Sequence, residues 1–152
     1  MKIGSLAVLY VFLVSCALMI GAVDAVAQTF KVSAGEEVVK TVDLHEGGVV
    51  SGRVNVVGGQ SNEIKFYITD PDGTIIVWFE NAGATNFGFT ASKTGTYSLH
   101  FDNTLSEWDK TVSLNYEVRY YIFGMPQELF YAFVVVLIGV VGVMVYVALA
   151  RT

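Results

Sequence analysis

A run of 22 residues without a single charge, residues 129–150, limits what this chain can fold into more than any other feature. Fourteen of these residues are Leu, Ile, Val or Phe. As an α-helix, the run would be about 33 Å long and could cross a hydrocarbon core of about 30 Å. The sequence therefore predicts a transmembrane helix over residues 129–150, with a juxtamembrane linker over 121–128 and a tail of residues 151–152.

A second charge-free run, residues 3–23, follows Lys2. The positive start, the apolar stretch and the small residues Ala25-Val26-Ala27 are typical of a secretory signal, so we expect a signal peptide over residues 1–27 that is cleaved after Ala27. The run is longer than most signal cores, which leaves an uncleaved signal anchor as the alternative. The stretch that ends at Cys16 resembles a bacterial lipobox, but the residues after it stay apolar, which favours a cysteine without a lipid anchor.

The positive residues beside the two apolar runs predict the orientation in the membrane. Arg151 follows the second run and Lys2 precedes the first, and positive residues favour the cytoplasmic side. We therefore expect a single-pass, type I protein of the cell membrane with residues 28–128 outside and the C-terminus in the cytoplasm. Nucleic acid is not an expected partner, because 14 acidic residues outnumber 9 basic ones and would repel phosphates.

Residues 28–120 show the alternation of apolar and polar residues that is typical of half-buried strands, with turn residues between the runs and no helical period. This pattern predicts an all-β, antiparallel sandwich of the jelly-roll type over residues 28–120. The expected strands lie near residues 29–33, 36–44, 48–57, 63–69, 74–80, 86–91, 96–102 and 110–120. The expected core residues are Phe66, Ile68, Phe87, Phe89, Tyr97, Leu99, Phe101, Leu114 and Tyr116, and Trp78 is assigned to the core as well.

The sequence Asp70-Pro71-Asp72-Gly73 predicts a tight turn that joins two of these strands into a hairpin. Proline fits the fixed φ angle of a type I turn, and glycine tolerates the positive φ angle that follows. Asp70 and Asp72 could instead bind Ca²⁺, but the third oxygen ligand and the distal glutamate of a calcium loop are missing. The turn is the favoured interpretation.

The end of this region resembles a known domain. The residues that carry the likeness are Gly95, then Tyr97, Leu99, Phe101 and Asn103 at alternate positions, then Ser106 in a loop, and Lys110-x-Val112 at the start of the last strand. They resemble the C-terminal signature of the GOLD (Golgi dynamics) domain, and residues 47–52, 64–68 and 70–73 resemble its earlier strands. The resemblance implies a compact β-sandwich for protein–protein recognition, which in eukaryotic secretory-pathway members is lumenal and linked to cargo selection.

This chain departs from the secretory-pathway members in three ways. It has no coiled-coil stretch before the span, no dilysine or diphenylalanine tail and no lumenal cysteine pair. Recruitment of vesicle coats is therefore not implied, and a prokaryotic, for example archaeal, surface protein is the expected setting.

The sequence offers no motif for catalysis. It has no G-x-S-x-G, no P-loop and no H-E-x-x-H, and its two histidines, His45 and His100, are far apart without a cysteine between them. We therefore expect no enzyme activity, no metal and no cofactor. The expected function is that of a protein-binding module on the membrane, and the alternatives are an accessory subunit of a larger membrane complex or a carbohydrate-binding module.

The best binding candidate in the sequence is Trp108, which stands between Glu107 and Asp109 in a predicted loop. An exposed aromatic residue can anchor a partner protein or a sugar. In the alternative interpretation, Trp108 folds back over the edge of the sandwich. His100 points outward from its strand as a solvated surface residue and is the fourth binding candidate, with Trp108, Glu107 and Asp109. Asn103 is expected to hold the following loop through hydrogen bonds to the backbone.

Overall fold

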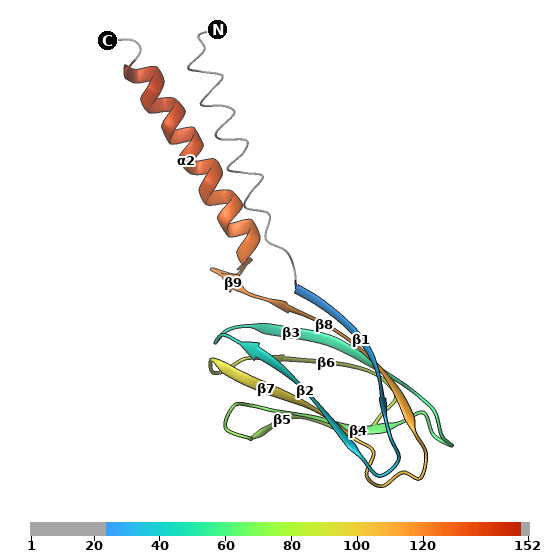
Figure 1. Cartoon of the computed structure of the whole chain (residues 1–152). Helices are drawn as coiled ribbons and strands as arrows, with labels where there is room; N and C mark the ends of the chain where they lie inside the picture. The colour runs from blue at the N-terminus through green and yellow to red at the C-terminus, as the bar shows by residue number, and fades with distance from the viewer. Residues whose placement is uncertain (1–23, 150–152) are drawn as a thin grey trace. The chain divides into compact units, whose positions relative to one another are not determined.

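The computed structural model describes residues 24–149, and eight of its strands form two four-stranded antiparallel sheets that face each other (Figure 1). The first sheet has the strand order β1-β8-β3-β6 and the second has the order β2-β7-β4-β5. The strands are β1 (Asp24–Val32), β2 (Glu37–Leu44), β3 (Val49–Val57), β4 (Ile64–Thr69), β5 (Ile75–Ala82), β6 (Ala84–Thr90), β7 (Gly95–Asp102) and β8 (Lys110–Arg119). This order is that of a jelly roll, so the predicted fold class is confirmed.

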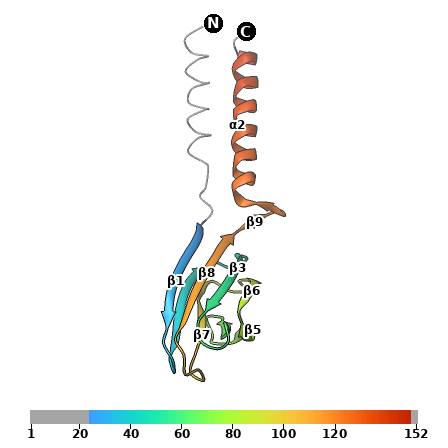
Figure 2. The same ribbon diagram turned by 90° about the vertical axis from the view of Figure 1, so that its right-hand side faces the viewer.

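The main difference from the predicted strands is at the start of the domain. Strand β1 begins at Asp24, five residues earlier than expected, and pairs along its whole length with β8 (Figure 2). Residues 24–27, which precede the predicted cleavage point, face residues 115–118 of β8 in this ladder. The expected signal segment before Asp24, with Cys16, and the tail 151–152 lie outside the described residues.

Aromatic rings fill the space between the two sheets. Phe66 lies at the centre, with its ring centroid 5.0 Å from that of Phe101 and 5.2 Å from that of Phe87. Seven of the nine predicted core residues are buried, and Phe89 and Tyr116 are partly buried against them. This core lies wholly within residues 24–120, so the sandwich has what a domain needs to fold without the rest of the chain.

The assignment of Trp78 to the core is wrong. Val77 and Phe79 pack against the core, so alternation along β5 turns Trp78 to the outer face, where it is 48% exposed. The turn before this strand is as predicted: β4 and β5 pair as a hairpin, and Asp70 Oδ1 accepts hydrogen bonds from the backbone N–H groups of Asp72 and Thr74.

A second unit of the chain begins at Tyr121. It opens with a hairpin of two short strands, β9 (Tyr121–Ile122) and β10 (Met125–Pro126), where a plain linker was expected. Helix α2 (Gln127–Leu149) follows, two residues earlier than predicted. Its stretch Gln127–Val145 is long and apolar enough to cross a membrane, with a mean hydropathy of 2.5.

Candidate recognition face

A row of side chains crosses the outer face of the β2-β7-β4-β5 sheet. The strand register aligns Val39 of β2 with His100 of β7, His100 with Tyr67 of β4, and Tyr67 with Trp78 of β5. Strand alternation turns all four side chains outward, because their sequence neighbours Val38, Leu99, Phe66 and Phe79 pack in the core. The row therefore brings together residues that lie far apart in the sequence.

Stacking fixes the aromatic members of this row. The rings of Tyr67 and His100 lie almost parallel, with centroids 4.3 Å apart and an interplanar angle of 6°. On its other side, Tyr67 contacts the ring of Trp78 at a centroid distance of 5.4 Å. Aromatic pairs at such separations contribute about 0.5–1.5 kcal/mol beyond their buried area, so stacking stabilises this arrangement of the three rings.

Glu37 of β2 joins the row through hydrogen bonds. Its Oε1 accepts a hydrogen bond of 2.7 Å from the Tyr67 hydroxyl and lies 3.0 Å from Nδ1 of His100. The other ring nitrogen of His100, Nε2, lies 3.3 Å from Oγ1 of Thr69. His100 points outward as predicted, but the prediction of a solvated residue is wrong, because its side chain is only 18% exposed and has polar partners at both nitrogens. We call Glu37, Tyr67, Trp78 and His100 the aromatic cluster.

An ion pair borders the aromatic cluster. Lys65 of β4 pairs with Asp102 of β7, and the Lys65 ammonium also lies 5.7 Å from the centroid of the Trp78 ring. Beyond this pair, a hollow of about 230 Å³ is lined by Lys65, Asp102, Glu80 and Leu105, among others. Cationic, acidic and apolar groups thus meet at one end of the same face.

The electrostatic environment holds these groups in defined protonation states. The hydrogen bond with Asp102 raises the pKa of Lys65 despite its partial burial. Partial burial alone would raise the pKa of Asp102, but hydrogen bonds from Lys65 and Thr104 outweigh it and hold the pKa below the usual value. Burial, together with the hydrogen bond to Glu37, raises the pKa of Tyr67 to about 12. Lys65 and Asp102 are therefore both charged near neutral pH, and Tyr67 keeps its proton.

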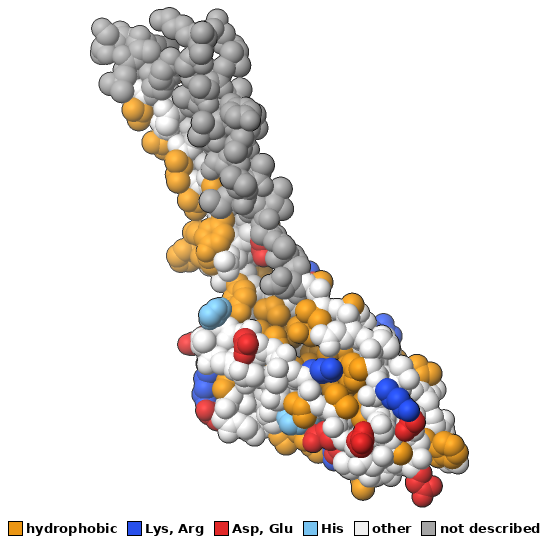
Figure 3. All heavy atoms as spheres, viewed as in Figure 1, with side chains coloured by type: hydrophobic (Ala, Val, Ile, Leu, Met, Phe, Trp, Pro, Cys, Tyr) orange, Lys and Arg blue, Asp and Glu red, His pale blue; other side chains and the backbone are white. Residues whose placement is uncertain are grey.

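Two exposed apolar residues extend the apolar part of this face beyond the cluster. Val39 lies at one end of the row, and Ile76 stands two residues before Trp78 on the same side of β5; both are exposed. Figure 3 shows apolar side chains among acidic and basic ones on the face of the domain that is turned toward the viewer. An apolar centre with a polar rim is typical of protein-binding surfaces.

The predicted candidates Trp108, Glu107 and Asp109 lie elsewhere, in the loop between β7 and β8. Trp108 is 53% exposed, and its side chain covers Gly59: a β-carbon added to Gly59 would lie 2.8 Å from Cβ of Trp108. Asp109 accepts a hydrogen bond from the backbone N–H of Ala34 and pairs with Lys31 at 2.6 Å, so it ties this loop to the β1–β2 turn. His100, the fourth predicted binding candidate, does not lie with these three residues, because it belongs to the aromatic cluster.

The residues that carry the GOLD resemblance hold the loops at this end of the sandwich. Nδ2 of Asn103 donates hydrogen bonds to the backbone oxygens of Ser33, at 3.0 Å, and Trp108, at 2.9 Å. The buried ammonium of Lys110 donates to the backbone oxygens of Gly58, at 3.0 Å, and Ser61. Both side chains bind the backbone of neighbouring loops, so their role is to stabilise the fold.

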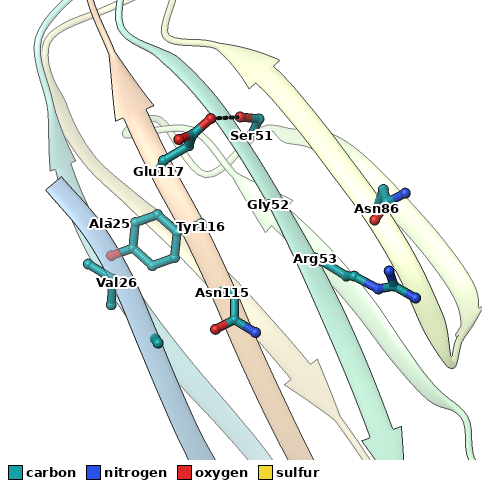
Figure 4. A pocket seen from close by; sticks show the side chains of 10 residues that line it. Ala25, Val26, Ser51, Gly52, Arg53, Asn86, Asn115, Tyr116 and Glu117 are labelled. Atoms are coloured by element: carbon teal, nitrogen blue, oxygen red, sulfur yellow. Dashed lines mark hydrogen bonds between the residues drawn. The ribbon is translucent and has the colours of Figure 1, made fainter. Parts of the chain in front are cut away.

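A larger hollow of about 420 Å³ lies on the outer face of the other sheet (Figure 4). Its polar side chains, among them Asn115, Arg53 and Asn86, come from β8, β3 and β6. Ser51 donates a hydrogen bond of 3.2 Å to Glu117, which also pairs with Arg119, so the charge of Glu117 is already matched within the sheet. Without a large exposed apolar residue in its lining, this hollow is a weaker candidate for recognition than the aromatic cluster.

No group of three or more His, Cys, Asp or Glu side chains is placed to hold a metal ion in the part of the chain that the structure describes, residues 24–149.

Sequence reasoning missed Glu37, Tyr67 and Trp78 as members of one surface. The alternation in residues 64–69 already places Tyr67 outward, and the alternation in 97–102 does the same for His100. The missing information was that β4 and β7 are neighbours, because 32 residues separate Tyr67 from its partner. Trp78 was hidden in an unbroken apolar run, residues 75–79, which shows no alternation.

Comparison with known proteins supports the resemblance found in the sequence. A transmembrane emp24 domain-containing protein of Arabidopsis thaliana, p24beta3, is 28% identical over 104 residues, which cover 64% of this chain and 49% of the plant protein. The chain thus spans about half the length of this relative. Among solved structures, PliG from Aeromonas hydrophila, a periplasmic inhibitor of g-type lysozyme, aligns with a TM-score of 0.51 at 13% identity over 64% of this chain and 89% of PliG. At this identity the likeness shows the fold alone.

The family model described as emp24/gp25L/p24 family/GOLD matches residues 27–125, which include both sheets of the sandwich except the first residues of β1. The match covers well over half of the chain and contains the motif residues from Gly95 to Lys110. The chain belongs to the emp24/gp25L/p24 family of GOLD proteins.

Proposed function

We propose that this protein is a single-pass membrane protein that binds another exported or membrane protein through the aromatic cluster and performs no chemistry. Helix α2 is its anchor in the lipid bilayer, and the GOLD sandwich is displayed on the outer or lumenal side with the C-terminus in the cytoplasm. The p24 family membership and the apolar helix support the membrane setting. The aromatic cluster supports the binding role.

The observation that carries the binding role is the exposed Trp78 beside a ring that is already fixed. Tyr67 is held by His100 on one face and by Glu37 at its hydroxyl, so these side chains lose little freedom when a partner docks. Tryptophan and tyrosine dominate the residues whose truncation costs most in protein interfaces. A pre-organised aromatic surface therefore fits protein recognition.

The charge of this face indicates the chemistry of the partner. The outward positions of the sheet include the acidic residues Glu37, Asp43 and Glu80, whereas the charges of Lys65 and Asp102 neutralise each other in an ion pair. Complementary charge speeds association and excludes wrong partners. We expect a partner segment that offers apolar side chains to Trp78 and positive side chains to the rim.

The experiment compares two tryptophans in the full-length protein. Trp78→Ala removes the exposed ring of the cluster, and Trp108→Ala removes a ring of similar exposure in the β7–β8 loop. After crosslinking in intact cells and detergent extraction, the Trp78→Ala variant should lose its partner protein, whereas the Trp108→Ala variant should keep it. Loss of a central aromatic anchor costs about 2 kcal/mol or more, which is roughly a thirtyfold loss of affinity.

Other outcomes separate the alternatives. Loss with Trp108→Ala alone would place the site in the β7–β8 loop, as the sequence predicts. Binding to a glycan array that depends on Trp108 would indicate a carbohydrate-binding module. Partners that remain in fixed stoichiometry with both variants after mild detergent extraction would indicate an accessory subunit held through the membrane. Turnover of a substrate by the purified domain would contradict the non-catalytic assignment.

A further inference from the structure

The β9–β10 hairpin carries an aromatic residue in an unusual backbone conformation. Ile122 pairs with Met125, so Phe123 and Gly124 are the two central residues of the turn, with φ angles of 51° and 76°. Such a turn is usually built from Asn, Asp or Gly, because other side chains are strained at positive φ. Phe123 is the one residue other than glycine with a positive φ between residues 24 and 149.

Contacts within the described chain do not account for this choice of residue. The Phe123 side chain is 90% exposed. Within residues 24–149, its ring contacts that of Phe130 in α2, at a centroid distance of 5.9 Å. A bulky ring that faces water gains little from its position, and a strained residue that persists in such a place points to a function. Residues 24–149 thus do not provide the surroundings that would stabilise the Phe123 side chain.

The surroundings that fit this residue are those of the lipid–water interface. The hairpin leads directly into α2, and residues 120–127 carry no charge. Exposed apolar or aromatic side chains continue from the hairpin into the first turns of the helix: Tyr121, Phe123, Met125, Leu129, Tyr131 and Phe133. Aromatic rings concentrate where membrane helices leave the hydrocarbon core.

We propose that the β9–β10 hairpin lies in the interfacial layer of the bilayer, with the Phe123 side chain inserted among the lipid chains beside the first turns of α2. This inference rests on the proposed role of α2 as a membrane anchor. The hairpin stays at the interface, because a two-residue ladder leaves backbone groups unpaired and such groups are excluded from hydrocarbon. Burial of the ring in lipid offsets the backbone strain that the turn carries.

The test measures the depth of single nitroxide labels on the full-length protein in phosphatidylcholine vesicles. Cys16 is the only cysteine, so Cys16→Ser provides the background for Phe123→Cys, Leu105→Cys and Val140→Cys. Leu105 is the matched control, because its side chain is 92% exposed in a loop of the sandwich. Collision with oxygen reports lipid surroundings, and collision with a water-soluble nickel chelate reports water.

We expect nickel access at position 123 to be several-fold lower than at 105, and oxygen access at 140 to be the highest of the three. Equal nickel access at 123 and 105, with 140 in hydrocarbon, would overturn the inference and leave the anchor role intact. Water-like values at 140 would overturn the anchor role itself and, with it, the inference.

A second comparison keeps the native ring. A label at Met125→Cys is measured with Phe123 present and with Phe123→Asn, a residue that tolerates the same backbone conformation but does not enter lipid. Nickel access at 125 should rise several-fold in the asparagine variant. Unchanged access would show that the ring does not hold the hairpin in the membrane, and would contradict the inference.

Discussion

Gly95 lies directly against the ring of Pro71: a β-carbon added to Gly95 would be 2.7 Å from Cγ of the proline. Gly95 opens β7, and Pro71 belongs to the turn between β4 and β5. The φ angle of Gly95, 153°, is also one that other residues rarely adopt. Two motifs that the sequence shows separately, the turn at 70–73 and the glycine before the Tyr97 strand, are therefore parts of one contact.

This contact predicts that Gly95→Ala destabilises the domain by about 2–3 kcal/mol, through backbone strain and collision with Pro71. Gly73→Ala is the matched control, because Gly73 also has a positive φ angle, 81°, but has open space around it. Urea unfolding of the isolated sandwich measures both. If both variants lose the same free energy of unfolding, the loss comes from backbone strain alone, and collision with Pro71 does not add to it.

Asn103 predicts a second stability effect. Its amide donates to the backbone oxygens of Ser33 and Trp108, so Asn103→Ala leaves these acceptors without their partner and should cost about 1–3 kcal/mol. Asn103→Asp should cost more, since a carboxylate in the same place repels both oxygens. Thermal melts of the sandwich test this order; a more stable aspartate variant would rule out the assigned hydrogen bonds.

The ion pair of Lys65 and Asp102 predicts a dependence of stability on pH. The folded domain lowers the pKa of Asp102 from 3.8, so the stability that this carboxylate contributes is fully present above that value and is lost as the pH falls through the lower, folded pKa. For Lys65, whose pKa is raised from 10.5, the contribution is present below that value and is lost as the pH rises through the folded pKa.

Asp102→Asn should therefore lower the free energy of unfolding at pH 7 by about 1–3 kcal/mol, and its difference from the native domain should shrink in acid below pH 3.8. Urea unfolding at a series of pH values measures this difference. Glu107→Gln, an exposed carboxylate in the β7–β8 loop, is the control. If the difference in free energy of unfolding between Asp102→Asn and the native domain stayed constant below pH 3.8, ionisation of Asp102 would not be the source of this stability.

The early start of β1 predicts that the boundary of the domain matters. A sandwich that begins at Gln28 lacks the four pairs that residues 24–27 form with β8. With up to about 1 kcal/mol for each hydrogen bond removed, the shorter domain should be less stable by about 1–3 kcal/mol. Thermal melts of domains 24–120 and 28–120 test this directly, and N-terminal sequencing of the protein from its membrane shows which form is made.

The sandwich could be predicted because most strands have one buried face, which leaves a period of two in the sequence. Phe66, Tyr97 and Leu114 are core residues for that reason. The pairing of strands could not be predicted, because β1 with β8 and β2 with β7 join opposite ends of the domain. The aromatic cluster depends on this pairing. The sequence therefore shows its residues individually but does not predict that they form one surface.

The remaining differences have local causes. Residues 24–27 (Asp-Ala-Val-Ala) are mostly small, so this sequence fits both a signal cleavage site and the start of β1. Gln127 and Glu128 are polar and were left out of the helix, yet the first turn of a helix accepts polar residues because its N–H groups lack partners in the helix. A period of two also cannot be read in residues 121–126, where each strand of the hairpin has two residues.

The pairing of Asp24 with Val118 means that the polypeptide enters and leaves the sandwich at the same end of one sheet. Tension between the two ends of the chain would act across neighbouring strands and separate β1 from β8 pair by pair, as a zipper opens, instead of shearing the whole ladder at once. We therefore expect a low unfolding force in this geometry. Single-molecule stretching from the two ends of the domain should detach β1 before the core unfolds.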